Sequence, residues 1–182
     1  MERMMENKQV TIIFVTETKA GFESDDFYLK RFVNYACKGL LMNHELTIQY
    51  LHMDGIGNYN KTKVLSDIRY YQRCSPFGPV YVIYVVDRDR LKDGNRLNDI
   101  ESFAKSNNYN LVVNCRTIED VFMQKIQGTK RLTAMQYKQQ PDEVYRQRRF
   151  YTDLQTIKKA KQGCSNLGLI LDAIISNAQK GE

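Results

Sequence analysis

Two aspartates, Asp87 and Asp89, stand one residue apart directly after the apolar residues 80–86. In an extended segment, residues i and i+2 point to the same side, so the two carboxylates would lie next to each other and repel. A hard divalent cation such as Mg²⁺ between them is the usual way to relieve that repulsion. The alternative is a solvated turn in which Arg88 and Arg90 neutralise the acids, and this stretch alone favours neither interpretation.

Two further acids follow other apolar runs of the chain. Glu17 comes after residues 10–15, and Glu119 comes a few positions after residues 111–113. If these runs are parallel strands, their carboxyl ends meet at one edge of the sheet, which is where ligands collect in such folds. We therefore expect the two glutamates to gather along one rim with the two aspartates.

The elements that must position these acids alternate between strands and helices. Residues 10–15 and 79–86 are continuous runs rich in Val, Ile and aromatic residues, which is typical of strands buried on both faces. Residues 46–51 alternate and are expected nearer an edge, and residues 111–113 form a short strand. Apolar residues at helical spacing lie between these strands. The alternation predicts an α/β fold, a parallel sheet of about four strands with helices on both faces.

The C-terminal third of the chain carries no strand pattern. We expect a long basic helix that begins at Pro141 and is interrupted at Gly163, and then a last helix capped by Ser165. The 182 residues therefore predict a single domain. Its α/β core would span residues 10–127, and an all-helical extension, residues 128–182, would pack on that core.

Composition argues against several classes of protein. No segment approaches the roughly 20 apolar residues that cross a bilayer, so no membrane association is expected. The first residues are polar and carry no secretory signal, and the four cysteines are widely spread, which favours a cytoplasmic protein with reduced thiols. With only two histidines, zinc sites and histidine-based triads have few ligands available.

The net charge of +6 is concentrated in one part of the chain. Residues 125–161 hold ten Lys or Arg and three acids, so this segment exceeds the excess of the whole chain. Such a basic region predicts a polyanionic partner, nucleic acid first, with a solvated helical surface as the alternative. Within it, Arg146, Arg148 and Arg149 would contact the substrate phosphates. The aromatic residues among them would either stack on bases or pack against the sheet, and packing is expected for at least one.

The order of these motifs resembles that of Toprim domains, in which a glutamate follows the first strand and an Asp-x-Asp follows a later one. Here the motifs are Val-Thr-Glu ending at Glu17 and Val-Val-Asp-Arg-Asp ending at Asp89. The chain most resembles the RloB-like, abortive-infection-type Toprim proteins of prokaryotic defence loci. Residues 113–122, with an asparagine before Glu119, and the late motif Ser-Asn-Leu-Gly from Ser165 resemble further elements of that family. The family usually carries Glu-Gly where this chain has Glu-Thr.

The resemblance implies a nuclease that depends on Mg²⁺ or Mn²⁺ and hydrolyses phosphodiester bonds of DNA or RNA in anti-phage defence. Glu17, Asp87 and Asp89 would bind the metal and serve catalysis, with Glu17 as a general base in one variant of the scheme. Glu119 would be a ligand of a second metal or, alternatively, the cap of its own helix.

Two cations and two other functions complete the expectations. Lys19 and Arg88 would hold the substrate phosphate, and for Arg88 a salt bridge to a neighbouring acid is the alternative. A non-catalytic Toprim-like module that binds nucleic acid, or a protein encoded nearby, is the second interpretation of the chain. A phosphoacceptor or nucleotide-binding α/β domain ranks third, because the sequence lacks a paired acid at the end of the first strand and a glycine-rich phosphate loop.

Overall fold

The computed structural model describes residues 8–19, 24–38, 44–88, 94–123, 142–161 and 163–180. Asp89, Arg90 and the first part of the basic segment, through Pro141, lie outside these ranges.

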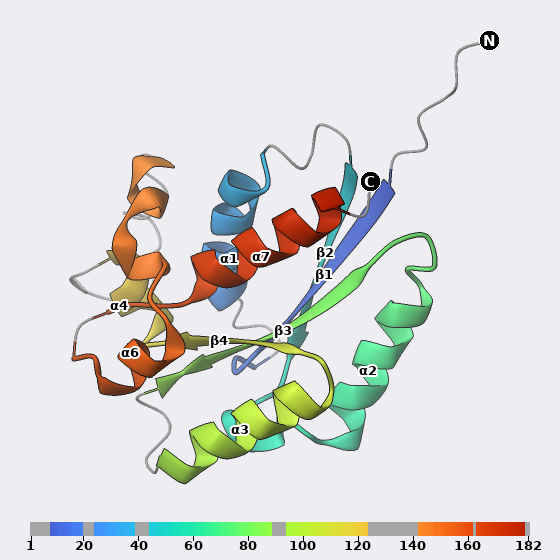
Figure 1. The fold of residues 1–182 in the computed structure, drawn as a ribbon. Coiled ribbons are helices and arrows are strands. Elements are labelled where there is room, and N and C mark those ends of the chain that lie inside the picture. The colour runs from blue at the N-terminus through green and yellow to red at the C-terminus, as the bar shows by residue number, and fades with distance from the viewer. Residues whose placement is uncertain are drawn as a thin grey trace.

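The predicted apolar runs form four strands: β1 (Lys8–Thr16), β2 (His44–His52), β3 (Val80–Asp87) and β4 (Asn110–Asn114). All neighbours are parallel, and the strand order is β2-β1-β3-β4 (Figure 1). The two continuous apolar runs are the inner strands β1 and β3, and the alternating run is the edge strand β2, as their patterns predict. The α/β class with a four-stranded parallel sheet is therefore confirmed.

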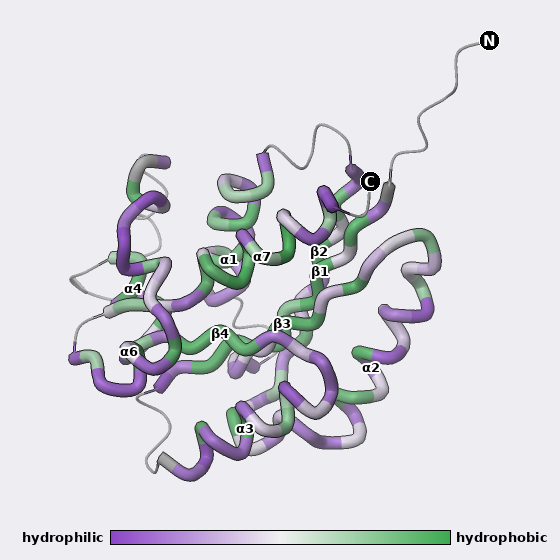
Figure 2. The backbone as a smooth tube through the Cα atoms, in the orientation of Figure 1, coloured by the Kyte–Doolittle hydropathy of each residue, from purple (hydrophilic) through white to green (hydrophobic). Residues whose placement is uncertain are grey.

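Helices cover both faces of this sheet, so β1 buries side chains in both directions. The elements outside the C-terminal extension are α1 (Ser24–Ala36), the 3-10 turn η2 (Ile56–Asn58), α2 (Thr62–Arg73), α3 (Gly94–Ser106) and α4 (Ile118–Met123). Ile12 and Phe14 pack with α1 and α4 on one face, while Ile13 and Val15 pack with α2 and α3 on the other. Figure 1 shows these helical layers, and Figure 2 shows that the strands are largely apolar while the helices carry many polar residues.

The described part of the extension is broken into short pieces, so the prediction of one long basic helix from Pro141 is wrong. The chain forms the 3-10 turns η4 (Asp142–Arg146) and η5 (Arg148–Phe150) and the short helix α6 (Leu154–Lys159). Tyr145 and Phe150 are both fully buried, with ring centroids 5.4 and 4.9 Å from that of Phe32. Five residues along an α-helix rotate the side chain by about 140°, so a continuous helix would not bury both rings on this face.

The extension then passes from one face of the sheet to the other. Phe150 belongs to the core beneath α1, whereas Ile157 of α6 belongs to the core beneath α2 and α3. Asp153 starts the new helix, because its carboxylate accepts the backbone N–H of Thr156 at 2.9 Å. A straight helix over this segment would not make that crossing.

The final helix, α7 (Leu167–Lys180), is joined firmly to the edge strand β4. The Oγ of Ser165 accepts the N–H of Leu167 at 3.2 Å, which confirms Ser165 as its cap. The side-chain amide of Asn166 accepts the N–H of Val113 at 2.8 Å and donates to the carbonyl of Leu111 at 2.9 Å. Asn166 thus satisfies backbone groups that an edge strand would otherwise leave unpaired.

Across the described ranges, no helix has the length and apolar character needed to cross a membrane.

Candidate active site

Glu17 and Asp87 meet at the carboxyl edge of the sheet, as their positions at the ends of parallel strands predict. Glu17 directly follows β1 and Asp87 is the last residue of β3, and these two strands are paired. The backbone N–H of Asp87 donates to Oε1 of Glu17 at 2.6 Å. Both side chains are buried, with exposed fractions of 5% and 6%. The two carboxylates therefore share one nearly dry region of the rim.

Asn114 holds the Asp87 carboxylate from the next strand. It ends β4 and is the register partner of Asp87, and its side-chain Nδ2 donates to Oδ1 of Asp87 at 3.1 Å. Asn114 is itself buried. The sequence pattern marks this asparagine only as part of a motif, because its contact depends on the register between β3 and β4.

The surroundings of this rim disfavour the ionised form of Asp87. Burial raises the pKa of Asp87 well above its usual value, and the negative charges of Glu17, Asp25 and Glu119 raise it further. The hydrogen bond from Asn114 acts in the opposite direction. Asp25 lies in the first turn of α1, where an acid also favours the start of the helix. Its contribution shows that four carboxyl groups from separate parts of the chain share one electrostatic environment.

Glu119, in the first turn of α4, belongs to this acidic cluster. Thr117 and Asp120 provide the cap of α4: the N–H and Oγ1 of Thr117 donate to Oδ2 of Asp120, at 3.3 and 3.1 Å. Glu119 is instead buried, with an exposed fraction of 4%. Burial raises the pKa of Tyr28, and the negative charges of Glu119 and Asp25 add to that rise. The cap contacts at the start of α4 are thus made by Thr117 and Asp120, and both roles expected for Glu119 stay predictions.

The residue types at this rim suit a hard divalent cation, but the described side chains alone do not form a complete site for one. All of its donors are oxygens, which Mg²⁺ and Mn²⁺ prefer, and the buried negative charge is what a cation would neutralise. Within the described residues, however, no three His, Cys, Asp or Glu side chains are placed to hold a metal ion. The described carboxylates fit a metal by donor type and charge, and Asp89 lies outside the described ranges.

The two cations expected near the phosphate make other contacts. The guanidinium of Arg88 donates to the carbonyl oxygens of Ile157 and Ala160, each at 2.5 Å, so it joins the end of β3 to the end of α6. This contact differs from both roles expected for Arg88, which were phosphate binding and a salt bridge to a neighbouring acid. Lys19 lies 3.7 Å from Asp54 in an exposed ion pair, and such pairs contribute little stability.

The three arginines of the extension have different surroundings. Arg146 donates from Nε to the hydroxyl of Tyr35 at 2.7 Å. Arg149 donates to the carbonyl of Phe122 at 3.1 Å, and its guanidinium lies 5.1 Å from the ring centre of Phe150. Arg148 is exposed and, among the described residues, its guanidinium has no hydrogen bond or ion pair. Arg148 is therefore the best placed of the three to bind a phosphate.

The aromatic residues among these arginines are mainly structural. Tyr145 and Phe150 are fully buried, which confirms the expectation of packing and leaves them no face for a base. The ring of Tyr151 lies against Gly168, where an added Cβ would come within 2.5 Å of the ring. None of the three is placed as an open stacking platform.

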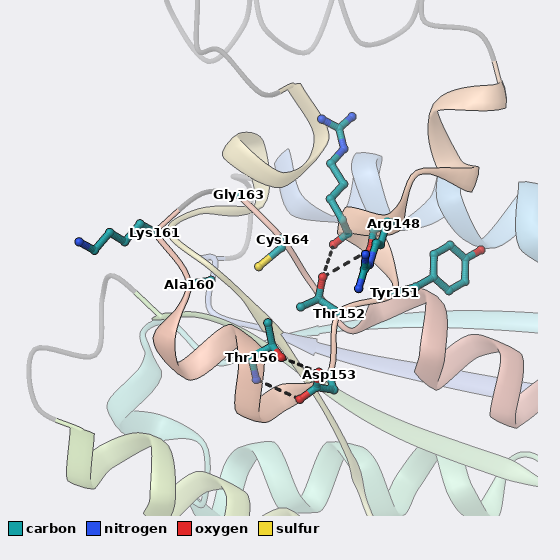
Figure 3. Close-up of a pocket in the computed structure, with 10 residues that line it drawn as sticks. Arg148, Tyr151, Thr152, Asp153, Thr156, Ala160, Lys161, Gly163 and Cys164 are labelled. Atoms are coloured by element: carbon teal, nitrogen blue, oxygen red, sulfur yellow. Dashed lines mark hydrogen bonds between the residues drawn. The ribbon is translucent and has the colours of Figure 1, made fainter.

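An open pocket of about 590 Å³ lies where the extension meets the carboxyl edge of the sheet (Figure 3). The residues that line it come from η5, the turn that follows it, α6 and the connection to α7: Arg148, Arg149, Tyr151, Thr152, Asp153, Thr156, Ala160, Lys161, Gly163 and Cys164. No local sequence pattern indicates this pocket, because the residues that line it meet only where the extension packs at the end of β4.

Comparisons with known proteins add no relative to this description. No protein-family model, curated protein or solved structure matches the chain. A function for it has to be derived from its own residues.

Proposed function

We propose that the chain is a metal-dependent nuclease of the Toprim type that hydrolyses phosphodiester bonds of DNA or RNA. The observation that carries the proposal is the buried meeting of Glu17 and Asp87 at the carboxyl edge, with the pKa of Asp87 raised by burial and by neighbouring carboxylates. Groups with strongly perturbed pKa values collect at functional sites, and this edge is where parallel sheets bind ligands.

Each residue has a stated part in this proposal. Glu17, Asp87 and Asp89 would hold Mg²⁺ or Mn²⁺, and Glu119 would lie beside them. A bound divalent ion supplies positive charge that polarises a phosphate oxygen. Asn114 keeps the Asp87 carboxylate in its orientation by the 3.1 Å hydrogen bond. The proposal extends to a cytoplasmic role in abortive-infection defence with a partner encoded nearby, a setting that the four free cysteines suit.

A non-catalytic module that binds nucleic acid or protein is the second candidate, and two observations favour it. No three described acid, histidine or cysteine side chains are placed to hold an ion, and Glu17 accepts a backbone hydrogen bond from Asp87. The pocket lined by Arg148, Arg149 and Lys161 would serve binding without any metal. In that case the acidic rim would be a remnant of a catalytic site.

Assays of cleavage and binding on the wild-type protein separate the two candidates. We expect cleavage of DNA or RNA with Mg²⁺ or Mn²⁺ and none in EDTA. Binding in EDTA should weaken steeply with salt, because phosphate contacts release counterions whether or not the protein is an enzyme. Single-stranded and duplex forms of DNA and RNA, with gel analysis of products, cover the substrate classes.

Two results of these assays count against the nuclease. Salt-sensitive binding without cleavage in either metal would establish the binding module in its place. The absence of any salt-sensitive binding would show that the basic segment is a solvated surface, and the partner would then have to be sought among proteins or small nucleotides.

A further inference from the structure

The pocket beside the carboxyl edge has the charge of an anion site. Three basic side chains and one carboxylate line it, which leaves two positive charges in excess. The single acid, Asp153, is occupied by Thr156, whose N–H and Oγ1 donate to it at 2.9 and 2.6 Å. Burial raises the pKa of the Cys164 thiol to about 11, so it stays neutral at pH 7 and adds no negative charge.

Its free donors lie on exposed side chains. Arg148 and Lys161 are exposed, and within the described part of the chain neither side chain has a hydrogen bond or ion pair. Figure 3 shows Thr152 and Thr156 toward the middle of the pocket, with Lys161 extending outward at its rim. The hydroxyls of these two threonines already donate to Asp153 and to the carbonyls of Arg148 and Arg149, so the donors left for a ligand are the guanidinium and the ammonium, which are usual donors to a phosphate group.

The inner wall of the pocket is formed by residues that contact the ends of β3 and β4. The carbonyl of Ala160 accepts from Arg88, the residue after Asp87, and from the thiol of Cys115, the residue after Asn114. The backbone N–H of Cys115 also donates to the carbonyl of Cys164 at 2.7 Å. A group bound in the pocket would therefore lie next to the rim that carries the carboxylates.

We infer that this pocket binds the terminal phosphomonoester of a nucleic-acid strand, so that the protein recognises phosphorylated strand ends. Two excess positive charges match the dianion of a phosphomonoester better than the single charge of a diester. A volume of about 590 Å³ is larger than a phosphate needs and lies within the range of sites that take nucleotide-sized ligands. The inference rests on the proposed function in taking the ligand to be a strand end, and a free nucleotide would supply the same chemistry.

Binding is to be measured in EDTA by fluorescence anisotropy, with an internally labelled single strand that carries a 5′ phosphate, a 3′ phosphate or hydroxyls at both ends. One phosphorylated end should bind about tenfold tighter than the hydroxyl strand, as expected for charge-assisted hydrogen bonds. Arg148→Ala and, independently, Lys161→Ala should remove that preference. Both side chains are exposed, so neither change should unfold the protein. Lys63→Ala, an exposed lysine on α2 outside the pocket, should keep the preference in full.

The possible outcomes each support or overturn the inference. Equal binding of phosphorylated and hydroxyl strands would overturn it, and so would an Arg148→Ala loss that falls equally on both. Thymidine monophosphate that competes as well as the phosphorylated strand would overturn the assignment to strand ends in favour of a free nucleotide. Because no metal is present, the preference does not depend on cleavage, and a protein that keeps it without any nuclease activity would refute only the proposed function.

Discussion

The Asp87→Asn variant should lose cleavage by about a thousandfold or more and yet be more stable than the wild type when no divalent ion is present. A thousandfold loss corresponds to about 4 kcal/mol of transition-state stabilisation, a plausible share for a metal ligand. The gain in stability has a separate cause. Asp87 is buried beside Glu17, and burial together with the charges of Glu17, Asp25 and Glu119 disfavours its ionised form.

The stability difference between the two proteins should depend on pH in a defined direction. The pKa of Asp87 is raised in the folded protein, so below the unfolded value near 4 the residue is protonated in both states and contributes nothing. As pH rises, the unfolded chain ionises first and the metal-free wild type loses free energy of unfolding until the folded pKa is passed. The asparagine cannot ionise, so the advantage of the variant should grow from pH 4 toward neutrality.

Urea denaturation in EDTA across this pH range, with parallel cleavage assays, checks both effects. Asp99→Asn is the matched control because Asp99 is exposed on α3, and it should change neither stability nor activity appreciably. A metal-free Asp87→Asn protein that is less stable than the wild type at pH 7 would show that the rim is not electrostatically strained.

An Asp89→Ala variant should likewise lose cleavage while keeping metal-free binding of nucleic acid.

Gly163→Ala should destabilise the fold by about 2 kcal/mol or more and disrupt the pocket. A Cβ at this position would lie 2.4 Å from the carbonyl oxygen of Asp120 and 2.6 Å from its carbon. These are backbone atoms of α4, so the neighbour cannot rotate away and the chain itself has to shift. The displaced segment includes Cys164, whose carbonyl accepts the N–H of Cys115 beside the carboxylate rim.

Gly57→Ala is a suitable control for that glycine. Nothing lies within 4 Å of a Cβ at position 57, so the change should alter the free energy of unfolding by no more than about 0.5 kcal/mol. Urea denaturation measures both variants, and strand binding in EDTA reports on the pocket. A Gly163→Ala protein with wild-type stability and wild-type end preference would show that the segment does not need this close approach.

The central features of the fold were readable from the sequence because they depend on local patterns. Continuous apolar runs identified the inner strands β1 and β3, and the rule that parallel strands present their carboxyl ends together placed Glu17 on the same rim as Asp87. Both inferences require only the order of the elements along the chain.

Features that depend on pairing between distant segments were not readable. The contact of Asn114 with Asp87 needs the register of β3 and β4, and the influence of Asp25 needs the docking of α1 on the sheet. The prediction of a long basic helix was wrong because helical propensity alone does not reveal that Tyr145 and Phe150 must both reach the same core. The pocket was missed for the same reason, since Lys161 and Arg148 come together only in the folded extension.

The proposed nuclease depends on divalent-ion binding by the rim, and a thermal melt with Mn²⁺ tests that binding most directly. An ion that binds only the folded state adds about 2.7 kcal/mol at a hundred times its Kd, so the melting temperature of the wild type should rise and then follow the logarithm of the Mn²⁺ concentration. Asp99→Asn should show the same rise, and Asp87→Asn should show none. A wild type whose melting temperature is unchanged by millimolar Mn²⁺, or an Asp87→Asn protein that keeps the full rise, would contradict a metal site at Glu17 and Asp87.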